Sequence, residues 1–253
     1  MTGVQTCALP ILISEGAFRR RTVLTPRGRS IRAEVEDDFH HFWVELDHDG
    51  AAIERIRSGA VRFPWSTCPA AGIHLARQLT GCSLDAPVDP PAAYSHCTHM
   101  LDLALLAASH AHDSQMTLFE SLVSDAKEPF QLARLSLNDQ VVMEWYLRET
   151  FIEPPSRQAG KDLRKMRNWD EELTRDERER AHLLRRAVFV SGGRGLDFTE
   201  IRTAAHFTAS AGACYTFQPA RSSNSLRMRG SARDFAGSGG PLGAPAESDR
   251  HGD

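Results

Sequence analysis

The sequence predicts an α+β fold in which helices pack on one face of a mainly antiparallel sheet. Apolar and charged residues alternate from Ile31 to Glu36, which is the pattern of a strand with one face in water. The pairs Asp49-Gly50 and Asn138-Asp139 supply hairpin turns between such runs. Hairpin signals of this kind outnumber strand–helix–strand patterns, so antiparallel pairing is favoured over a parallel sheet.

The first group of strands is expected between Phe18 and Pro64. Ile31, Ala33 and Val35 alternate with charged residues, and a second alternating run reaches Leu46. Asp49-Gly50 tolerates positive φ, so the following strand is expected to run back from about residue 53 to residue 63. The pattern predicts an antiparallel meander. Further strands are expected at residues 118–123, 130–137 and 141–147.

Four helices are predicted from apolar spacing and from end signals. Two of them cover residues 69–79 and about 99–110, and the second is apolar almost all round, which is typical of a buried helix. A third is expected over residues 161–173. The run from Thr174 to Glu177 fits a capping box, and Ser191-Gly192-Gly193 is expected to end the helix that it begins.

Residues 18–235 are expected to form one α+β domain. Residues 1–11 resemble the conceptual translation of a widely used sequencing adapter and are excluded from fold reasoning. Glu153-Pro154-Pro155 breaks the chain, so a subdomain boundary is predicted near residues 153–160. Residues 236–253 are rich in Gly, Ser and Pro, a composition that predicts a disordered tail.

The overall composition is that of an ordinary soluble protein. The 253 residues are 41% hydrophobic and 25% charged, with a formal net charge of −3, which argues against a general nucleic-acid-binding protein. No stretch after residue 11 has the pattern of a secretory or membrane segment, so a reducing cytoplasm is expected. Beyond Cys7, four cysteines are too sparse for a disulfide scaffold: Cys68, Cys82, Cys97 and Cys214.

Two cysteines are predicted at helix N-termini, where the helix dipole favours thiolate over thiol. Pro69 suits a first helical turn and places Cys68 at or beside a cap, while Thr98 is the expected cap of the helix after Cys97. With His99, the two thiolates could ligate zinc or another thiophilic metal. The alternatives are a thiol redox or nucleophilic site and, more simply, buried cysteines beside a histidine with local hydrogen bonds.

Three further residues are candidates to complete such a site. His40 is the inward member of its predicted strand, with Asp38 on the same face as a partner for proton transfer. Asp102 is an acid inside an apolar helix, and His99, three residues earlier, is the nearest predicted partner. Cys214 becomes a candidate through the resemblance described next.

From Phe18 to about Phe235 the chain resembles the bacterial family labelled domain of unknown function 2889. The resemblance is carried by the residues of four stretches: 60–69, 97–102, 186–190 and 212–219. The family has no assigned activity, so the resemblance implies a bacterial protein and adds Cys214 to Cys68 and Cys97 as a candidate site residue. More loosely, Thr67-Cys68-Pro69 before a helix looks like the Cys-Pro openings of small iron–sulfur scaffold domains.

The sequence predicts two alternative functions. The favoured one is a binding or structural module without chemistry of its own, because each reactive cluster has a simpler structural explanation. The alternative is a zinc or iron–sulfur site, or a thiol redox pair, that uses Cys68, Cys97 and His99 with His40, Asp102 or Cys214. The sequence leaves open whether the protein is an enzyme, which ligand it takes and its oligomeric state.

Overall fold

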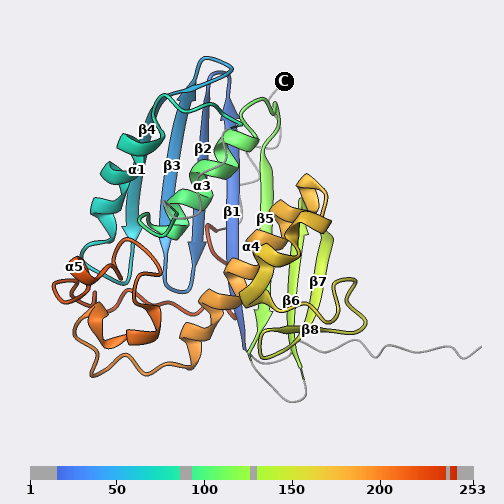
Figure 1. Cartoon of the computed structure of the whole chain (residues 1–253), viewed down its shortest axis with the longest axis vertical. Coiled ribbons are helices and arrows are strands. Elements are labelled where there is room, and N and C mark those ends of the chain that lie inside the picture. Colours follow the sequence, from blue (N-terminus) through green and yellow to red (C-terminus); the bar gives the residue numbers. More distant parts are fainter. Residues whose placement is uncertain (1–15, 86–92, 126–129, 238–239, 244–253) are drawn as a thin grey trace, which may run out of the picture.

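The protein is described from a computed structural model that covers residues 16–85, 93–125, 130–237 and 240–243 (Figure 1). Its centre is an eight-stranded sheet of order β4-β3-β2-β1-β5-β6-β7-β8, and every neighbouring pair is antiparallel. The predicted α+β class and antiparallel sheet are confirmed. The adapter-like residues 1–11 and most of the predicted tail lie outside the described residues.

Two four-stranded meanders make up this sheet, and the pairing of β1 with β5 joins them. The first meander contains β1 (Ala17–Arg27), β2 (Ser30–Asp37), β3 (His41–His48) and β4 (Ile53–Arg62). The second contains β5 (Thr117–Ser124), β6 (Gln131–Leu137), β7 (Gln140–Arg148) and the short β8 (Phe151–Glu153), which the sequence analysis missed. Asn138 and Asp139 both adopt positive φ, as the predicted hairpin between β6 and β7 requires.

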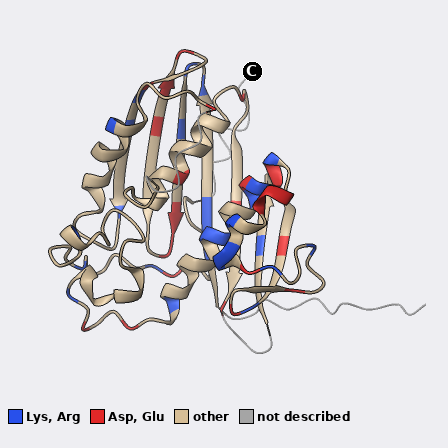
Figure 2. Cartoon of the chain, viewed as in Figure 1, with Lys and Arg blue, Asp and Glu red and all other residues tan. Residues whose placement is uncertain are grey.

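The period-two pattern separates a buried face of the sheet from a charged one. Across β2 and β3, Ala33 pairs with Val44 and Val35 with Phe42, and all four side chains are fully buried. The intervening residues are half-buried and form ion pairs on the opposite face, such as the one between Arg32 and Glu34. Figure 2 shows these charges spread along the strands and along helix α4 (Arg175–Ser191).

The long helices contact different parts of the sheet, and Figure 1 shows α1, α3 and α4 on the near side of it. Helix α1 (Ala71–Leu79) packs against β4, and α3 (Thr98–Ser109) packs against β2 and β3. Helix α4 packs against β5 and β6. Its capping box is formed as predicted, and it ends at Gly192. No helix among the described residues combines the length and apolarity that a membrane span needs.

The helix predicted over residues 161–173 is instead two short 3₁₀ helices, Leu163–Asn168 and Asp170–Glu172. Asp162 caps the first of them, and Lys165 inside it has non-helical angles. The indole of Trp169 donates a hydrogen bond back to the Asp162 carbonyl, and both Met166 and Trp169 are buried. Tertiary packing of these two side chains therefore overrides the local preference for an α-helix. The predicted subdomain boundary near residues 153–160 stays a prediction.

Residues 196–235, named here the C-terminal segment, have little regular structure beyond short helices such as α5 (Pro219–Ser222). An isolated β-bridge between Arg227 and Trp65 attaches the segment to the chain after β4. A second β-bridge, between Leu226 and Thr203, lies within the segment. It is seen as the orange loops at the lower left of Figure 1, beside α1. Of the tail predicted to be disordered, residues 240–243 lie against β1 and β2, where the Leu242 amide donates to Glu36 over 2.7 Å.

Candidate functional site

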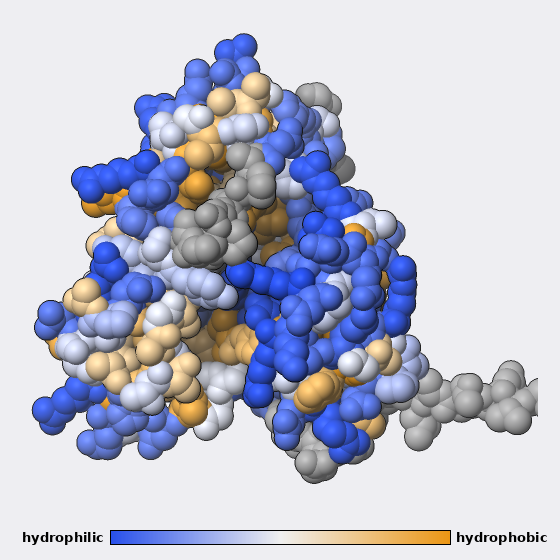
Figure 3. All heavy atoms as spheres, viewed as in Figure 1, coloured by the Kyte–Doolittle hydropathy of each residue, from blue (hydrophilic) through white to orange (hydrophobic). Residues whose placement is uncertain are grey.

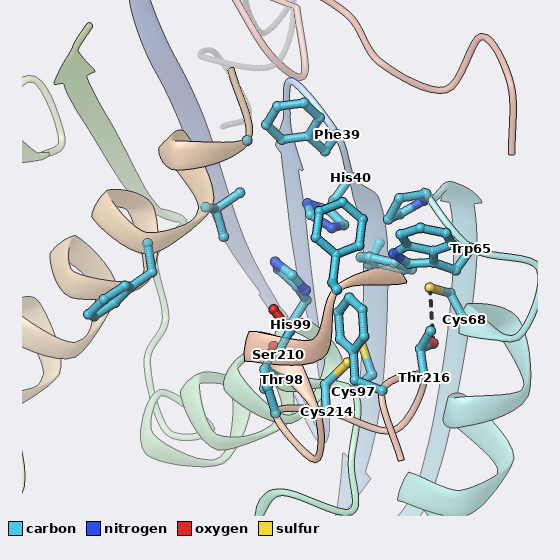
Figure 4. A pocket seen from close by; sticks show the side chains of 18 of the residues that line it. Phe39, His40, Trp65, Cys68, Cys97, Thr98, His99, Ser210, Cys214 and Thr216 are labelled. Carbon is cyan, nitrogen blue, oxygen red and sulfur yellow. Dashed lines mark hydrogen bonds between the residues drawn. The ribbon is translucent and has the colours of Figure 1, made fainter. Parts of the chain in front are cut away.

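A cavity of about 320 Å³ lies between the sheet, the N-terminus of α3, the C-terminal half of α4 and the C-terminal segment. Figure 3 shows apolar surface in a hollow between the region of α5 and α4, and Figure 4 shows the cavity from close by. Seven Phe and Trp side chains line it: Phe39, Phe42, Trp65, Phe189, Phe198, Phe207 and Phe217. The cavity is therefore mainly apolar, with a few polar groups in its wall.

The turn between β2 and β3 places His40 on the cavity wall. Oδ1 of Asp37 accepts hydrogen bonds from the amides of Phe39 and His40, each over 2.9 Å, which is an Asx-type turn. The same oxygen lies 3.0 Å from Nδ1 of His40. His40 is thus in a turn and not in a strand, so the predicted Asp38–His40 pair is wrong. Asp38 instead forms an ion pair with Arg194.

Asp37 is fully buried and remains ionised. Its Oδ2 accepts a hydrogen bond from Arg20 over 2.6 Å. Burial alone would raise the pKa of Asp37, but His40 and Arg20 outweigh burial and lower that pKa to about 2. The negative charge of Asp37 fixes the orientation of the His40 ring, which is the usual effect of a carboxylate behind an imidazole.

His99, in the first turn of α3, stacks on His40 with ring centroids 3.9 Å apart. The residue is 9% exposed, and its Nε2 has no hydrogen-bond partner in the part of the chain that the structure describes. Burial, followed by the nearby His40, Arg20 and Arg186, lowers the pKa of His99 well below its usual value. His99 is therefore a neutral imidazole at physiological pH.

Among the described residues, Asp37, His40 and His99 form the group of metal-ligand types whose donor atoms lie within 4.8 Å of one another. Two imidazoles and a carboxylate suit a transition metal in type. The carboxylate, however, already accepts three hydrogen bonds at Oδ1 and one at Oδ2, which leaves one acceptor site, on Oδ2. The lone pairs of the two stacked rings lie in planes only 29° apart, so they do not converge on one ion. The geometry favours an oriented histidine stack over a metal centre.

The two predicted cysteines do lie at helix N-termini. Cys68 begins a 3₁₀ helix with Pro69, and Cys97 is itself the N-cap of α3, so Thr98 is the first helical residue and not the cap. Figure 4 shows the Cys68 sulfur next to Thr216, while the side chains of Cys97 and Cys214 lie beside each other. All three line the cavity, and all three are free thiols.

Cys68 and Cys97 were predicted to be thiolates, but their burial favours the protonated thiol. Burial raises the pKa of Cys68 to about 11 and raises the pKa of Cys97 further. It also raises the pKa of Cys214. A helix N-terminus lowers a thiol pKa only where the thiolate is hydrated or paired, and here desolvation is the larger effect. None of the three sulfurs belongs to the histidine–aspartate group, so a metal on Cys68, Cys97 and His99 stays a prediction.

Asp102 is not part of the cavity wall and is not the partner of His99. It accepts a hydrogen bond from Nε of Arg186 over 2.7 Å, which links α3 to α4. A guanidinium cation stabilises a half-buried carboxylate more strongly than a neutral imidazole does. The three-residue spacing of His99 and Asp102 along one helix therefore predicted the wrong partner for Asp102.

Sequence reasoning missed the aromatic residues of the C-terminal segment and Arg227. Trp65 makes edge-to-face contacts with Phe207 and Phe217, at centroid distances of 5.9 and 6.0 Å. The signal present in the sequence was the recurrence of Phe in a segment without helical or strand period. Such residues need a buried surface elsewhere in the chain to pack against.

The comparisons with known proteins found no family model that matches the chain and no curated protein that matches it. The resemblance to domain of unknown function 2889 therefore stays a prediction.

Proposed function

We propose that the protein is a binding module that takes a small, mainly apolar ligand into the cavity beside His99. The observation that carries the proposal is the cavity itself, about 320 Å³ in volume and walled by aromatic side chains. Concave, mainly apolar sites with few polar groups are typical of small-molecule binding. The wall is assembled from the β2–β3 turn, α3, α4 and the C-terminal segment.

The polar groups of the wall support binding over thiol chemistry. Cys68, Cys97 and Cys214 line the same cavity, which is the observation that would favour a thiol site. Their pKa values are all raised, so each sulfur is a protonated and weakly nucleophilic thiol at neutral pH. Neutral thiols and a neutral imidazole instead provide weakly polar contacts for a bound molecule.

The test uses 4-butylbenzamide and 4-butylbenzoate as probes in titration calorimetry. Each has an apolar body that the cavity volume accommodates, and we expect saturable binding of at least one probe with one-to-one stoichiometry. Ala213 lines the cavity, so Ala213→Phe should fill the space and weaken binding by about tenfold or more. The exposed Ala232 provides the matched control, because Ala232→Phe adds the same group outside the cavity. Absence of binding by both probes, or equal binding by the two variants, would refute the proposal.

A further inference from the structure

The charge of the cavity wall restricts which apolar ligands can bind. Among the described residues that line the cavity, two are arginines, Arg186 and Arg227, and none is Asp or Glu. Arg186 is neutralised by its ion pair with Asp102 from α3. Because His40 is paired with the buried Asp37 carboxylate, Arg227 is the charged residue of the described wall that has no acidic partner.

Arg227 contributes an uncompensated positive charge. Its Nη1 donates to the Pro64 carbonyl over 2.9 Å and to Ser231 Oγ over 2.8 Å, and both acceptors are neutral. No carboxylate of the described residues lies within ion-pair distance of it. The remaining donors, Nε and Nη2, form no hydrogen bond with any of the described residues, which leaves them for a ligand.

Aromatic rings hold the Arg227 guanidinium at the cavity. It lies over Phe198 at 4.7 Å and over Trp65 at 5.7 Å from the ring centroids. Such stacking fixes the plane of the guanidinium, which leaves its in-plane donors for a planar anion such as a carboxylate. Burial also lowers the pKa of Arg227, which means that its charge is incompletely solvated and that a bound anion would stabilise it.

We infer that the ligand is an apolar monocarboxylate whose carboxylate binds Arg227 and whose body fills the aromatic cavity. The inference rests on the proposed function and adds the chemical class of the ligand. No other group of the wall opposes an anion, because the lining thiols and His99 are uncharged. A fixed, incompletely solvated cation in an apolar cavity discriminates strongly between an anion and a neutral isostere.

The test compares three probes of nearly equal shape with the wild-type protein. These are 4-butylbenzoate, the neutral 4-butylbenzamide and the cationic 4-butylbenzylamine, each titrated by calorimetry at pH 7.5 and low salt. We expect the benzoate to bind at least about tenfold more tightly than the amide, and the amine to bind most weakly. Equal or tighter binding of the amide would overturn the inference while leaving the proposed function intact. Failure of all three probes to bind would refute the proposed function itself.

Variants of Arg227 test whether this residue causes the preference for the benzoate over the amide. Arg227→Gln should weaken benzoate binding by about tenfold or more and change amide binding by less than about twofold, whereas Arg227→Lys should keep part of the preference. Arg221→Gln is the matched control, since that guanidinium lies over Tyr215 at 4.0 Å and does not line the cavity. A benzoate affinity unchanged in Arg227→Gln would overturn the inference. The wild-type comparison decides the question if that variant fails to fold.

Discussion

Cys97 caps the amino end of α3, where free amide groups would stabilise a thiolate, yet its thiol stays protonated. Burial also determines the ionisation state of two other residues of the cavity wall: it keeps His99 neutral and raises the pKa of Cys68. Asp37 differs because Arg20 and His40 pair with it, and so it stays ionised although it is equally buried. A partner of opposite charge therefore decides which buried group carries a charge in this region.

The first prediction concerns the reactivity of the thiols. Iodoacetamide at pH 7.5 should modify Cys82 first, because that side chain is partly exposed and lies outside the cavity. Cys68 and Cys97 should react at least about a hundredfold more slowly in the native protein, since they are buried and their pKa values are raised. Peptide mass spectrometry over time measures both rates, and the urea-unfolded protein is the control, in which Cys68, Cys82 and Cys97 should react alike. Rapid native labelling of Cys97 would show that it is a reactive thiolate.

At the scale of elements, polar side chains join α3 to α4 along their length. Asp102 in α3 pairs with Arg186 in α4, and His110 at the C-terminal end of α3 lies 3.1 Å from Glu179. The other ring nitrogen of His110 lies 2.7 Å from Asp113. These contacts hold two helices that pack on different meanders, and so they connect the two halves of the sheet.

The second prediction is a loss of stability above neutral pH that depends on His110. Burial alone would lower the pKa of His110, but Glu179 and Asp113 raise it to about 8. A raised folded-state pKa means that the stabilisation is complete below the unfolded value near 6.5 and is lost as pH rises through about 8. From pH 6 to pH 9 the wild type should lose about 1 kcal/mol more unfolding free energy than His110→Gln, a figure reduced because Asp113 is 45% exposed.

Urea denaturation of both proteins at the two pH values provides the measurement. The other histidines are common to wild type and variant, so their titration cancels in the comparison. An identical pH dependence in the two proteins would show that the His110 contacts do not contribute to stability.

At the scale of the whole molecule, Arg194 joins parts of the chain that are distant in sequence. It contacts Asp38 of the β2–β3 turn at 2.5 Å, Asp125 after β5 at 2.8 Å, and Asp234 of the C-terminal segment at 2.9 Å. The side chain of Asp38 is only 1% exposed. Arg194 therefore connects both meanders to the segment that closes the cavity.

The third prediction is that Arg194→Met destabilises the protein by about 3 kcal/mol at pH 7, because the buried Asp38 loses its partner. Burial already raises the pKa of Asp38 against the effect of Arg194. Without the guanidinium that pKa should rise further, so the deficit should shrink near pH 4.5, where the acid can bind a proton. Urea denaturation at both pH values tests the sign, and hydrogen exchange should accelerate in residues 196–235.

Arg134→Met is the matched control, since it removes a half-exposed ion pair with Glu144 and should change stability by less than about 1 kcal/mol. Equal effects of the two substitutions would show that the Arg194 contacts do not connect the molecule in this way.

The sequence by itself determined most of the local elements, the helix predicted over residues 161–173 and strand β8 excepted, because their signals lie in neighbouring residues. Period-two alternation located the strands, paired turn residues located the hairpins, and Thr174 with Glu177 located the start of α4. The positions of Cys68 and Cys97 at helix starts also followed from adjacent residues such as Pro69.

Only the tertiary structure decided which side chains meet. His40 contacts Asp37 and not Asp38 because the strand ends in an Asx turn. Asp102 pairs with Arg186, which is 84 residues away in the sequence. The aromatic wall depends on Trp65 meeting residues about 140 to 150 positions later, in a segment with no period of its own. These tertiary contacts also determine the ionisation states, because desolvation and ion pairing depend on all the groups around a side chain and not only on its neighbours in sequence.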